Sequence, residues 1–225
     1  MEQREALLLA RRQMQGGLQS TIAPSGYLLG YETLGECMRD PGLRAFFGHA
    51  LLDEIMPCVE TPARGEVEQL AMALCREMEG PLASQPLFPF TQNGVRAWAA
   101  QALPLLELYA RKRGAVPPCL CFGLAALIML FAGARRTSEG AYEGFRQEEG
   151  YPLEEAEEIL AAFSRLSCDM PPEMLAYAVL SDQDIWGRDL REIPGLEDAA
   201  AGQLRDLQLL GLRAAMEKAW AGKTD

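Results

Sequence analysis

Residues 120–134 read LCFGLAALIMLFAGA and contain no charged side chain. Pro117-Pro118 precedes the run, and its apolar residues occupy every face of a helix, which is typical of a helix surrounded by others. The full apolar stretch, residues 119–134, is shorter than the ~18 residues expected of a membrane span. We therefore expect it to form the centre of a protein core.

On both sides of this run, apolar residues recur three and four positions apart, as on one face of a helix. Proline and glycine mark where the expected helices begin and end. Gly16-Gly17 ends or bends the first helix, Asp40 is a plausible N-cap before Pro41, and Gly114 stops the helix that ends in Arg113. We expect helices over residues 2–15, 24–38, 41–55, 64–79, 91–113, 172–180 and 196–220.

No segment alternates with the period of two that a half-buried strand requires. The fold class is therefore predicted as all-α, a single multi-helix domain over residues 1–225 with a nearly fully buried central helix. Residues 138–158 carry eight glutamates. Paired carboxylates can do acid and base work, but such a run usually covers a solvated helical face, and we interpret it in that way.

The chain has 225 residues, 49% of them hydrophobic, and a formal net charge of −11. This length and composition suit a globular protein with a substantial core. The negative charge disfavours nucleic acid and anionic membranes as partners, because clustered Lys and Arg make those contacts. The six cysteines lie in apolar segments and the first twelve residues lack signal-peptide features, so we expect buried, reduced thiols and a cytoplasmic location.

General-purpose chemical motifs are scarce. Neither a GxGxxG nor a GxxxxGK loop occurs, so we expect no cofactor-binding site in this chain. Cys119 and Cys121 are two residues apart on an expected helix and point in different directions, which disfavours a metal site. His49, the single histidine, lies between Phe47 and Leu51 without an identifiable Ser, Cys or carboxylate partner, and a structural role is expected.

Four blocks of the sequence resemble one family, in the same order. The chain is similar to the C-terminal domain of the mannitol dehydrogenase family, in particular its tagaturonate reductase (altronate oxidoreductase) branch. The resemblance implies a helical domain of the 6-phosphogluconate dehydrogenase C-terminal type, which in the family follows an NAD(P)-binding Rossmann domain. The blocks are GYLLGYETLGECMRDPGLRAFF (26–47), EIMPC (54–58), PPCLCFGLAALIMLFAGAR (117–135) and IWGRDLREIPGL (185–196).

The family's catalytic motif, Lys-x4-Asn-x2-His, falls on Arg11, Gly16 and Gln19. In the family the lysine is the general acid/base, while the asparagine and histidine hold the oxygen of the substrate. Arginine stays protonated up to a pKa of about 12, so it cannot exchange a proton near neutral pH. Glycine has no side-chain donor, and glutamine does not titrate. The resemblance therefore implies no catalytic residue in this chain.

A second family cluster, Asn-Pro-x3-His followed by a lysine, falls on Gly80, Pro81, Gln85 and Ala97, with Asn93-Gly94 as a landmark. Arginine forks suit carboxylates, and a new pocket here could bind an anionic sugar acid. The candidate substrate-binding residues are Arg11, Gln19, Gln85, Asn93 and Arg96. No cofactor-binding or metal-binding residue is assigned, and NAD is expected only through a separate Rossmann-domain subunit.

Three functional interpretations stay open. The chain is a non-catalytic relative that acts as a protein-binding or regulatory module, and its former domain interface then seeks a partner, either a second copy or a Rossmann-domain subunit. Alternatively, it is the substrate-binding half of a split NAD-dependent hexuronate or polyol oxidoreductase. The third interpretation is a stable helical module whose retained residues only pack.

Overall fold

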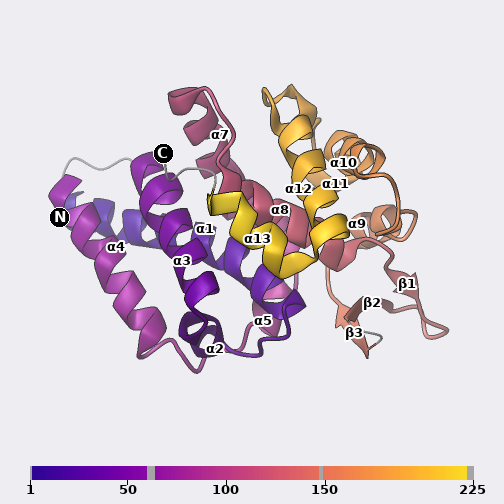
Figure 1. Cartoon of the computed structure of the whole chain (residues 1–225), viewed down its shortest axis with the longest axis horizontal. Helices are drawn as coiled ribbons and strands as arrows, with labels where there is room; N and C mark the ends of the chain where they lie inside the picture. The colour runs from indigo at the N-terminus through magenta and orange to yellow at the C-terminus, as the bar shows by residue number, and fades with distance from the viewer. Residues whose placement is uncertain (1, 60–63, 147–148, 222–225) are drawn as a thin grey trace.

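The computed structural model describes residues 2–59, 64–146 and 149–221. Helix α8 (Pro118–Phe131) lies in the middle of the molecule (Figure 1), where α1 (Glu2–Leu28), α12 (Leu196–Leu210) and α13 (Leu212–Ala221) pack against it. Every α8 residue except Pro118 and Met129 is buried. The prediction of a buried central helix is confirmed.

The start of α8 lies inside the protein, where its backbone donors need partners. Glu54 supplies them. Its carboxylate accepts hydrogen bonds from the backbone N–H groups of Cys119 (2.8 Å) and Leu120 (2.9 Å), and the residue is only 2% exposed. A buried charged side chain therefore anchors the central helix to the segment that carries residues 50–55.

Helix α1 is continuous through Gly16-Gly17, so the prediction that these glycines end the helix is wrong. Their role is close approach. A Cβ atom at Gly17 would lie 2.5 Å from Leu105 Cδ1, and one at Gly16 would lie 2.3 Å from Gln101 Oε1. Pro24 lies inside the same helix rather than at the start of a second one.

The predicted helix over residues 24–38 is also wrong, because a turn at Gly30 (φ 94°) separates α1 from α2 (Leu34–Arg39). Thr33 and Glu36 form a capping box at the start of α2. Asp40 then caps α3 (Pro41–His49) through Leu43 N–H at 3.0 Å, which confirms the predicted N-cap.

A π-helical turn, η1 (Ala50–Ile55), and a 3-10 turn, η2 (Met56–Cys58), follow α3. Pro57 lies in η2, whereas Pro62, also expected to close this element, lies outside the described residues. Helix α4 (Arg64–Glu79) has the predicted bounds.

The predicted long helix over residues 91–113 is divided into three. These are α5 (Phe88–Thr91), α6 (Gly94–Gln101) and α7 (Leu103–Arg113). The first break is at Asn93, whose left-handed backbone (φ 52°) cannot continue a helix. Gly114, also left-handed at φ 67°, ends α7 as predicted.

Within residues 138–158, where a helical face was predicted, segments 142–146 and 149–153 pair as a β-hairpin. Strands β1 (Arg135–Arg136), β2 (Tyr142–Arg146) and β3 (Glu149–Leu153) make an antiparallel sheet in that order, with Tyr142 opposite Leu153. Tyr142, Gly144, Tyr151 and Leu153 face the core. Glycines and a proline disfavour a helix here, and the hairpin lies at one edge of the molecule (Figure 1). Helices still dominate the described chain, so the all-α class is confirmed apart from this sheet.

The C-terminal part begins with α9 (Glu157–Phe163), α10 (Pro172–Ser181), α11 (Gln183–Trp186) and η3 (Leu190–Glu192). The short helix predicted after Pro171 corresponds to α10. The single final helix predicted over residues 196–220 is divided, because Gly211 (φ 78°) separates α12 from α13.

Candidate functional site

A hollow of about 420 Å³ opens between α1, α5 and α6. Helix α1 lines one side with Arg12, Gln15, Gly16, Gln19 and Ser20, and the other side consists of Phe90, Ala97 and Gln101. This hollow, which we call the α1–α6 pocket, lies within the size range of small-molecule sites. Five of the eight described lining residues have polar side chains, and none of the eight is a carboxylate.

The two family motifs meet in this pocket. Gly16 and Gln19 occupy the asparagine and histidine positions of the first motif, and Ala97 occupies the lysine position of the second, 78 residues beyond Gln19. Their convergence supports the register in which both motifs were placed. All three lack a group that titrates near neutral pH.

The continuity of α1 explains which of its side chains face the pocket. Arg12, Gly16 and Gln19 are four and three residues apart, so they lie on one face of an unbroken helix. Gln101 fills the space in front of Gly16, with its side-chain oxygen 2.3 Å from where a Cβ would be. The Gln101 amide of α6 therefore occupies the space that a side chain at position 16 of α1 would need.

Arg11 faces a different neighbour. Its guanidinium forms two hydrogen bonds with the carboxylate of Glu77 in α4, one of them 2.9 Å long between Nη1 and Oε1. The hydrogen bond from Glu77 raises the pKa of Arg11, and the same bond lowers the pKa of Glu77. Arg11 thus links α1 to α4 through an ion pair, and it lies outside the described lining of the pocket.

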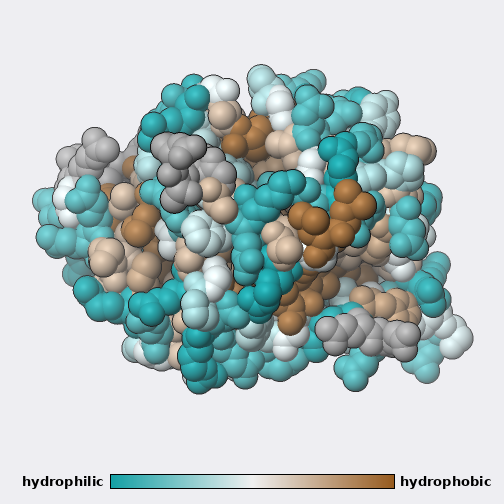
Figure 2. Space-filling view, viewed as in Figure 1, coloured by the Kyte–Doolittle hydropathy of each residue, from teal (hydrophilic) through white to brown (hydrophobic). Residues whose placement is uncertain are grey.

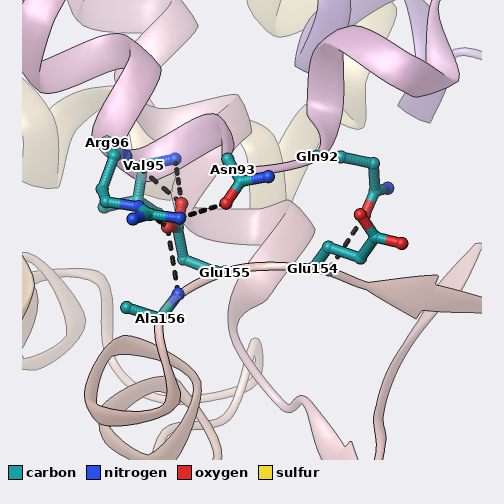
Figure 3. Close-up of polar contacts among 7 residues, drawn as sticks. All are labelled: Gln92, Asn93, Val95, Arg96, Glu154, Glu155 and Ala156. Carbon is teal, nitrogen blue, oxygen red and sulfur yellow. Dashed lines mark hydrogen bonds and ion pairs between the residues drawn. The ribbon is translucent and has the colours of Figure 1, made fainter.

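Asn93 and Arg96 belong to a separate polar cluster around Glu155, shown in Figure 3. The Glu155 side chain is fully buried and accepts hydrogen bonds from Val95 N–H (3.0 Å), Arg96 N–H (3.2 Å) and Arg96 Nε (2.5 Å). Arg96 also donates to Asn93 Oδ1. Glu155 therefore closes the start of α6 and joins it to the segment that leaves the hairpin.

Gln85 lies in the loop after α4, next to an isolated bridge between Thr33 and Pro86. Its backbone carbonyl accepts a hydrogen bond from Leu34 N–H at 3.0 Å, and its side-chain oxygen is buried without a hydrogen-bond partner among the described residues. Of the five predicted substrate-binding residues, Gln19 is thus the one in the described lining of the α1–α6 pocket. Substrate binding by any of them stays a prediction.

Sequence reasoning missed Arg12, Gln15, Ser20, Phe90 and Gln101. A signal for the α1 residues was present, because a helix that continues through Gly16-Gly17 places Arg12 and Gln19 seven residues apart on one face. Gln101 gave no comparable signal, since only the packing of α6 against α1 brings it to Gly16.

The single histidine and the cysteines lie outside the described lining of the α1–α6 pocket. His49 Nδ1 lies 2.6 Å from Asp53 Oδ2 and its ring stacks on Trp220, so the expectation that it has no carboxylate partner is wrong. None of the six cysteines, all of them described residues, forms a disulfide, and Cys75 and Cys168 are partly exposed rather than buried as predicted. Burial raises the pKa of Cys37 and of Cys121 to about 12.

Two further kinds of feature are absent from the described residues. No group of three or more His, Cys, Asp or Glu side chains is placed to hold a metal ion among them. No helix in the described ranges has both the length and the apolar character needed to cross a membrane.

Two solved structures share the fold. Mannitol 2-dehydrogenase from Pseudomonas fluorescens, in a ternary complex with NAD and D-mannitol, superposes with a TM-score of 0.76 at 14% identity, over 96% of this chain and 41% of that one. A D-sorbitol dehydrogenase in substrate-free form gives a TM-score of 0.68 at 14% identity, over 92% of this chain and 40% of that one.

The proteins similar to this chain in sequence are altronate oxidoreductases. Altronate oxidoreductases from Klebsiella pneumoniae (strain 342) and Cronobacter sakazakii are 32% and 34% identical, over 89% of this chain and 40% of their own length. The chain thus spans about two-fifths of these relatives. The family model described as mannitol dehydrogenase C-terminal domain matches residues 12–208. The chain therefore belongs to the family of mannitol dehydrogenase C-terminal domains.

Proposed function

We propose that this chain is a non-catalytic member of its family, which acts as a binding or regulatory module. One observation carries the proposal: none of the three residues at the first catalytic motif can perform the role that the resemblance assigns to that position. Arg11 is held by Glu77, Gly16 has no side chain, and Gln19 offers only an amide. A general acid/base must exchange its proton near the working pH, which a guanidinium does not do.

The α1–α6 pocket supports a binding role. Arg12 is exposed, and the structure gives it no hydrogen bond or ion pair with another described residue, so its guanidinium is available to a ligand. Gln15, Gln19 and Gln101 add amide donors and acceptors around it. This set suits a small hydroxylated carboxylate, because the arginine fork pairs with the carboxylate and the amides with hydroxyls.

The first experiment tests catalysis. Purified protein is mixed with NADH and tagaturonate or fructuronate, and NADH oxidation is followed with the Klebsiella pneumoniae altronate oxidoreductase as a positive control. We expect no turnover by this chain, whether alone or together with the isolated N-terminal part of that enzyme. Turnover in either mixture overturns the non-catalytic proposal.

A second experiment tests binding separately by isothermal titration with altronate and tagaturonate. Arg12→Gln should weaken binding by about tenfold, the effect of losing one charge-assisted contact. Arg4→Gln is the matched control, since Arg4 is an exposed arginine two turns earlier on α1 and outside the pocket lining. Equal affinities of the two variants, or no binding by the original chain, remove the pocket from the proposal and leave the catalytic result standing.

One observation favours the split-enzyme alternative. Leu8 and Leu9 are 49% and 57% exposed, and their spacing from Arg12 places them on the pocket side of α1. An exposed apolar pair beside a pocket is suited to a partner surface. In that case the partner is a Rossmann-domain subunit that brings the NAD, and this chain supplies the substrate-binding half.

Light scattering after size-exclusion chromatography tests this alternative. If it is correct, the chain forms a complex with the isolated N-terminal part of the altronate oxidoreductase, and replacing Leu8 and Leu9 by Gln abolishes the complex. Met72→Gln is the control, because Met72 is equally exposed (50%) on α4. A monomer in every mixture contradicts both this alternative and self-association, whereas a dimer of this chain alone supports self-association.

A further inference from the structure

A second hollow, of about 660 Å³, lies between α2, the start of α3 and the end of α4. These three segments are neighbours in Figure 1. The hollow shares no lining residue with the α1–α6 pocket. We call it the α2–α4 pocket, and its size also lies within the range of small-molecule sites.

Close backbone packing gives the α2–α4 pocket its shape. Gly35 N–H donates to the Ala83 carbonyl at 2.8 Å, and a Cβ at Gly35 would lie 2.8 Å from both the Cβ and the carbonyl oxygen of Ala83. The chain after α4 is therefore held directly against α2. Ala45 and Ala83 are short side chains, so the space between the helices stays open without any opening motion.

The charged groups around the pocket leave one cation available. Arg44 pairs with Glu79 at 2.7 Å. Arg39 is exposed, and no hydrogen bond or ion pair joins it to another described residue. The nearby carboxylate of Glu36 accepts two backbone N–H groups, at 2.7 and 3.2 Å, and that of Asp40 is held by Tyr31 and Arg213.

We propose that the α2–α4 pocket binds a small organic carboxylate, with the Arg39 guanidinium on the carboxylate and the apolar lining on the body of the ligand. Met38, Pro41 and Ala45 provide that apolar contact. A single available guanidinium matches one carboxylate in a two-bond fork. Because Arg44 and Glu79 pair with each other, the charge of Arg39 is the one that stays uncompensated within the described pocket lining. The proposal does not depend on the function proposed above.

Methyl-labelled protein titrated with sodium propionate and sodium benzoate tests the site by NMR. We expect the methyl signals of Met38, Ala45 and Ala83 to shift with saturation, and propionamide and benzamide, which lack the charge, to bind at least about tenfold more weakly. Arg39→Gln should weaken carboxylate binding by a similar factor. Arg4→Gln is the control, because Arg4 is exposed and lines neither pocket, and it should leave these shifts unchanged.

Ala45→Leu provides a second test, which keeps both arginines of the pocket, Arg39 and Arg44. Its larger side chain fills part of the pocket, and it should abolish the shifts at Met38 and Ala83 while the rest of the spectrum stays that of the folded protein. The proposal is overturned if amides and carboxylates bind equally, if Arg39→Gln binds as the unmodified chain does, or if neither carboxylate shifts these methyl signals.

Discussion

Two neighbouring arginines of α1 face different parts of the molecule. Arg11 points to α4 and pairs with Glu77, whereas Arg12, about 100° further around the helix, lines the α1–α6 pocket. Alignment with a motif gives the number of a residue but not the direction of its side chain. In this chain, the cation of the pocket comes from the position next to the motif lysine.

Asp40 is a polar residue that forms hydrogen bonds with several segments of the chain. It caps α3 and accepts hydrogen bonds from Tyr31 and Arg213. Burial alone raises the pKa of Asp40, but the hydrogen bonds from Arg213, Leu43 N–H and Tyr31 outweigh burial and lower it to about 2. The ionised carboxylate is therefore the form that the folded state favours.

This lowered pKa predicts a pH effect on stability. A carboxyl whose pKa is lower in the folded state stabilises the fold above its unfolded pKa of 3.8, and the contribution disappears as the pH falls towards about 2. The contribution is roughly 2 kcal/mol. Urea unfolding of the original chain and of Asp40→Asn should differ by about this amount at neutral pH, and the difference should shrink between about pH 4 and pH 2. A difference that does not change with pH contradicts the assignment.

At the scale of elements, contacts with distant segments of the chain position α6. Its first N–H groups bind Glu155, which follows the hairpin, and its last residue, Gln101, covers Gly16 of α1. The hairpin and α6 are thus mechanically joined through one buried carboxylate (Figure 3). A wall of the α1–α6 pocket depends on a segment that contributes no residue to its described lining.

Replacing Glu155 by Ala should loosen this joint. The start of α6 loses its acceptor, so we expect a loss of roughly 1–3 kcal/mol in unfolding free energy and faster hydrogen exchange at Val95 and Arg96. Glu154→Ala is a matched control, because Glu154 is exposed and the hydrogen bonds that join it to Gln92 and Asn93 use its backbone rather than its side chain. Similar exchange rates in both variants would argue against a capping role.

Two glycines in different helices, Gly17 in α1 and Gly202 in α12, predict opposite outcomes on replacement by alanine. Gly17→Ala places a methyl 2.5 Å from Leu105 Cδ1, and such overpacking costs about 1–3 kcal/mol. Gly202→Ala in α12 meets nothing within 4 Å, so the change should instead stabilise the helix by about 0.5–1 kcal/mol. Thermal unfolding of the two variants checks both signs in one experiment.

At the scale of the whole molecule, α13 joins parts that are distant in sequence. It lies beyond residue 208, where the family match ends, yet it packs on α8 and α3. Arg213 reaches Asp40, and Trp220 stacks on His49. Figure 2 shows a hydrophobic area at the junction of α12 and α13 on an otherwise largely hydrophilic face, where Leu209 and Leu210 are 74% and 50% exposed.

Ending the chain after Leu210 should therefore destabilise the whole domain rather than only its last turn. Removal of α13 uncovers part of α8 and leaves Asp40 without Arg213, so we expect a lower unfolding midpoint and aggregation on heating. Arg213→Ala, which keeps the helix, should reproduce only the ion-pair part of the loss. Equal midpoints for the truncated and complete chains would show that α13 packs without stabilising the core.

Much of this architecture was predictable where neighbouring residues decide the outcome. The apolar pattern and the terminal prolines and glycines were enough for α4 and α8, and Asp40-Pro41 marked the start of α3 correctly. Prediction failed where contacts distant in sequence decide, as at Gly16-Gly17, which pack against α6 and α7. The prediction missed the hairpin for another reason. The buried face of β2 consists of Tyr142 and Gly144, so the alternation of apolar and polar residues along the strand is weak.

The candidate site was predictable in part. The resemblance placed Gly16, Gln19 and Ala97 in related motifs, and the structure brings all three into one pocket. It could not place Arg12 or Gln101, because the first depends on helix rotation and the second on the approach of another helix. Asn93 and Arg96 were selected as polar residues near a motif. Arg96 instead donates to Asn93 and to the buried carboxylate of Glu155, which lies about sixty residues away in the sequence.

The contact between Gln101 and Gly16 also constrains how this sequence can change. An asparagine at position 16 would need the space that the Gln101 amide now fills, so its effect depends on whether position 101 has already become smaller. The two positions are therefore epistatic, and a double-mutant cycle of Gly16→Asn and Gln101→Ala should give a non-additive stability. A change toward the family motif at position 16 would therefore need an order, in which position 101 becomes smaller before position 16 gains a side chain.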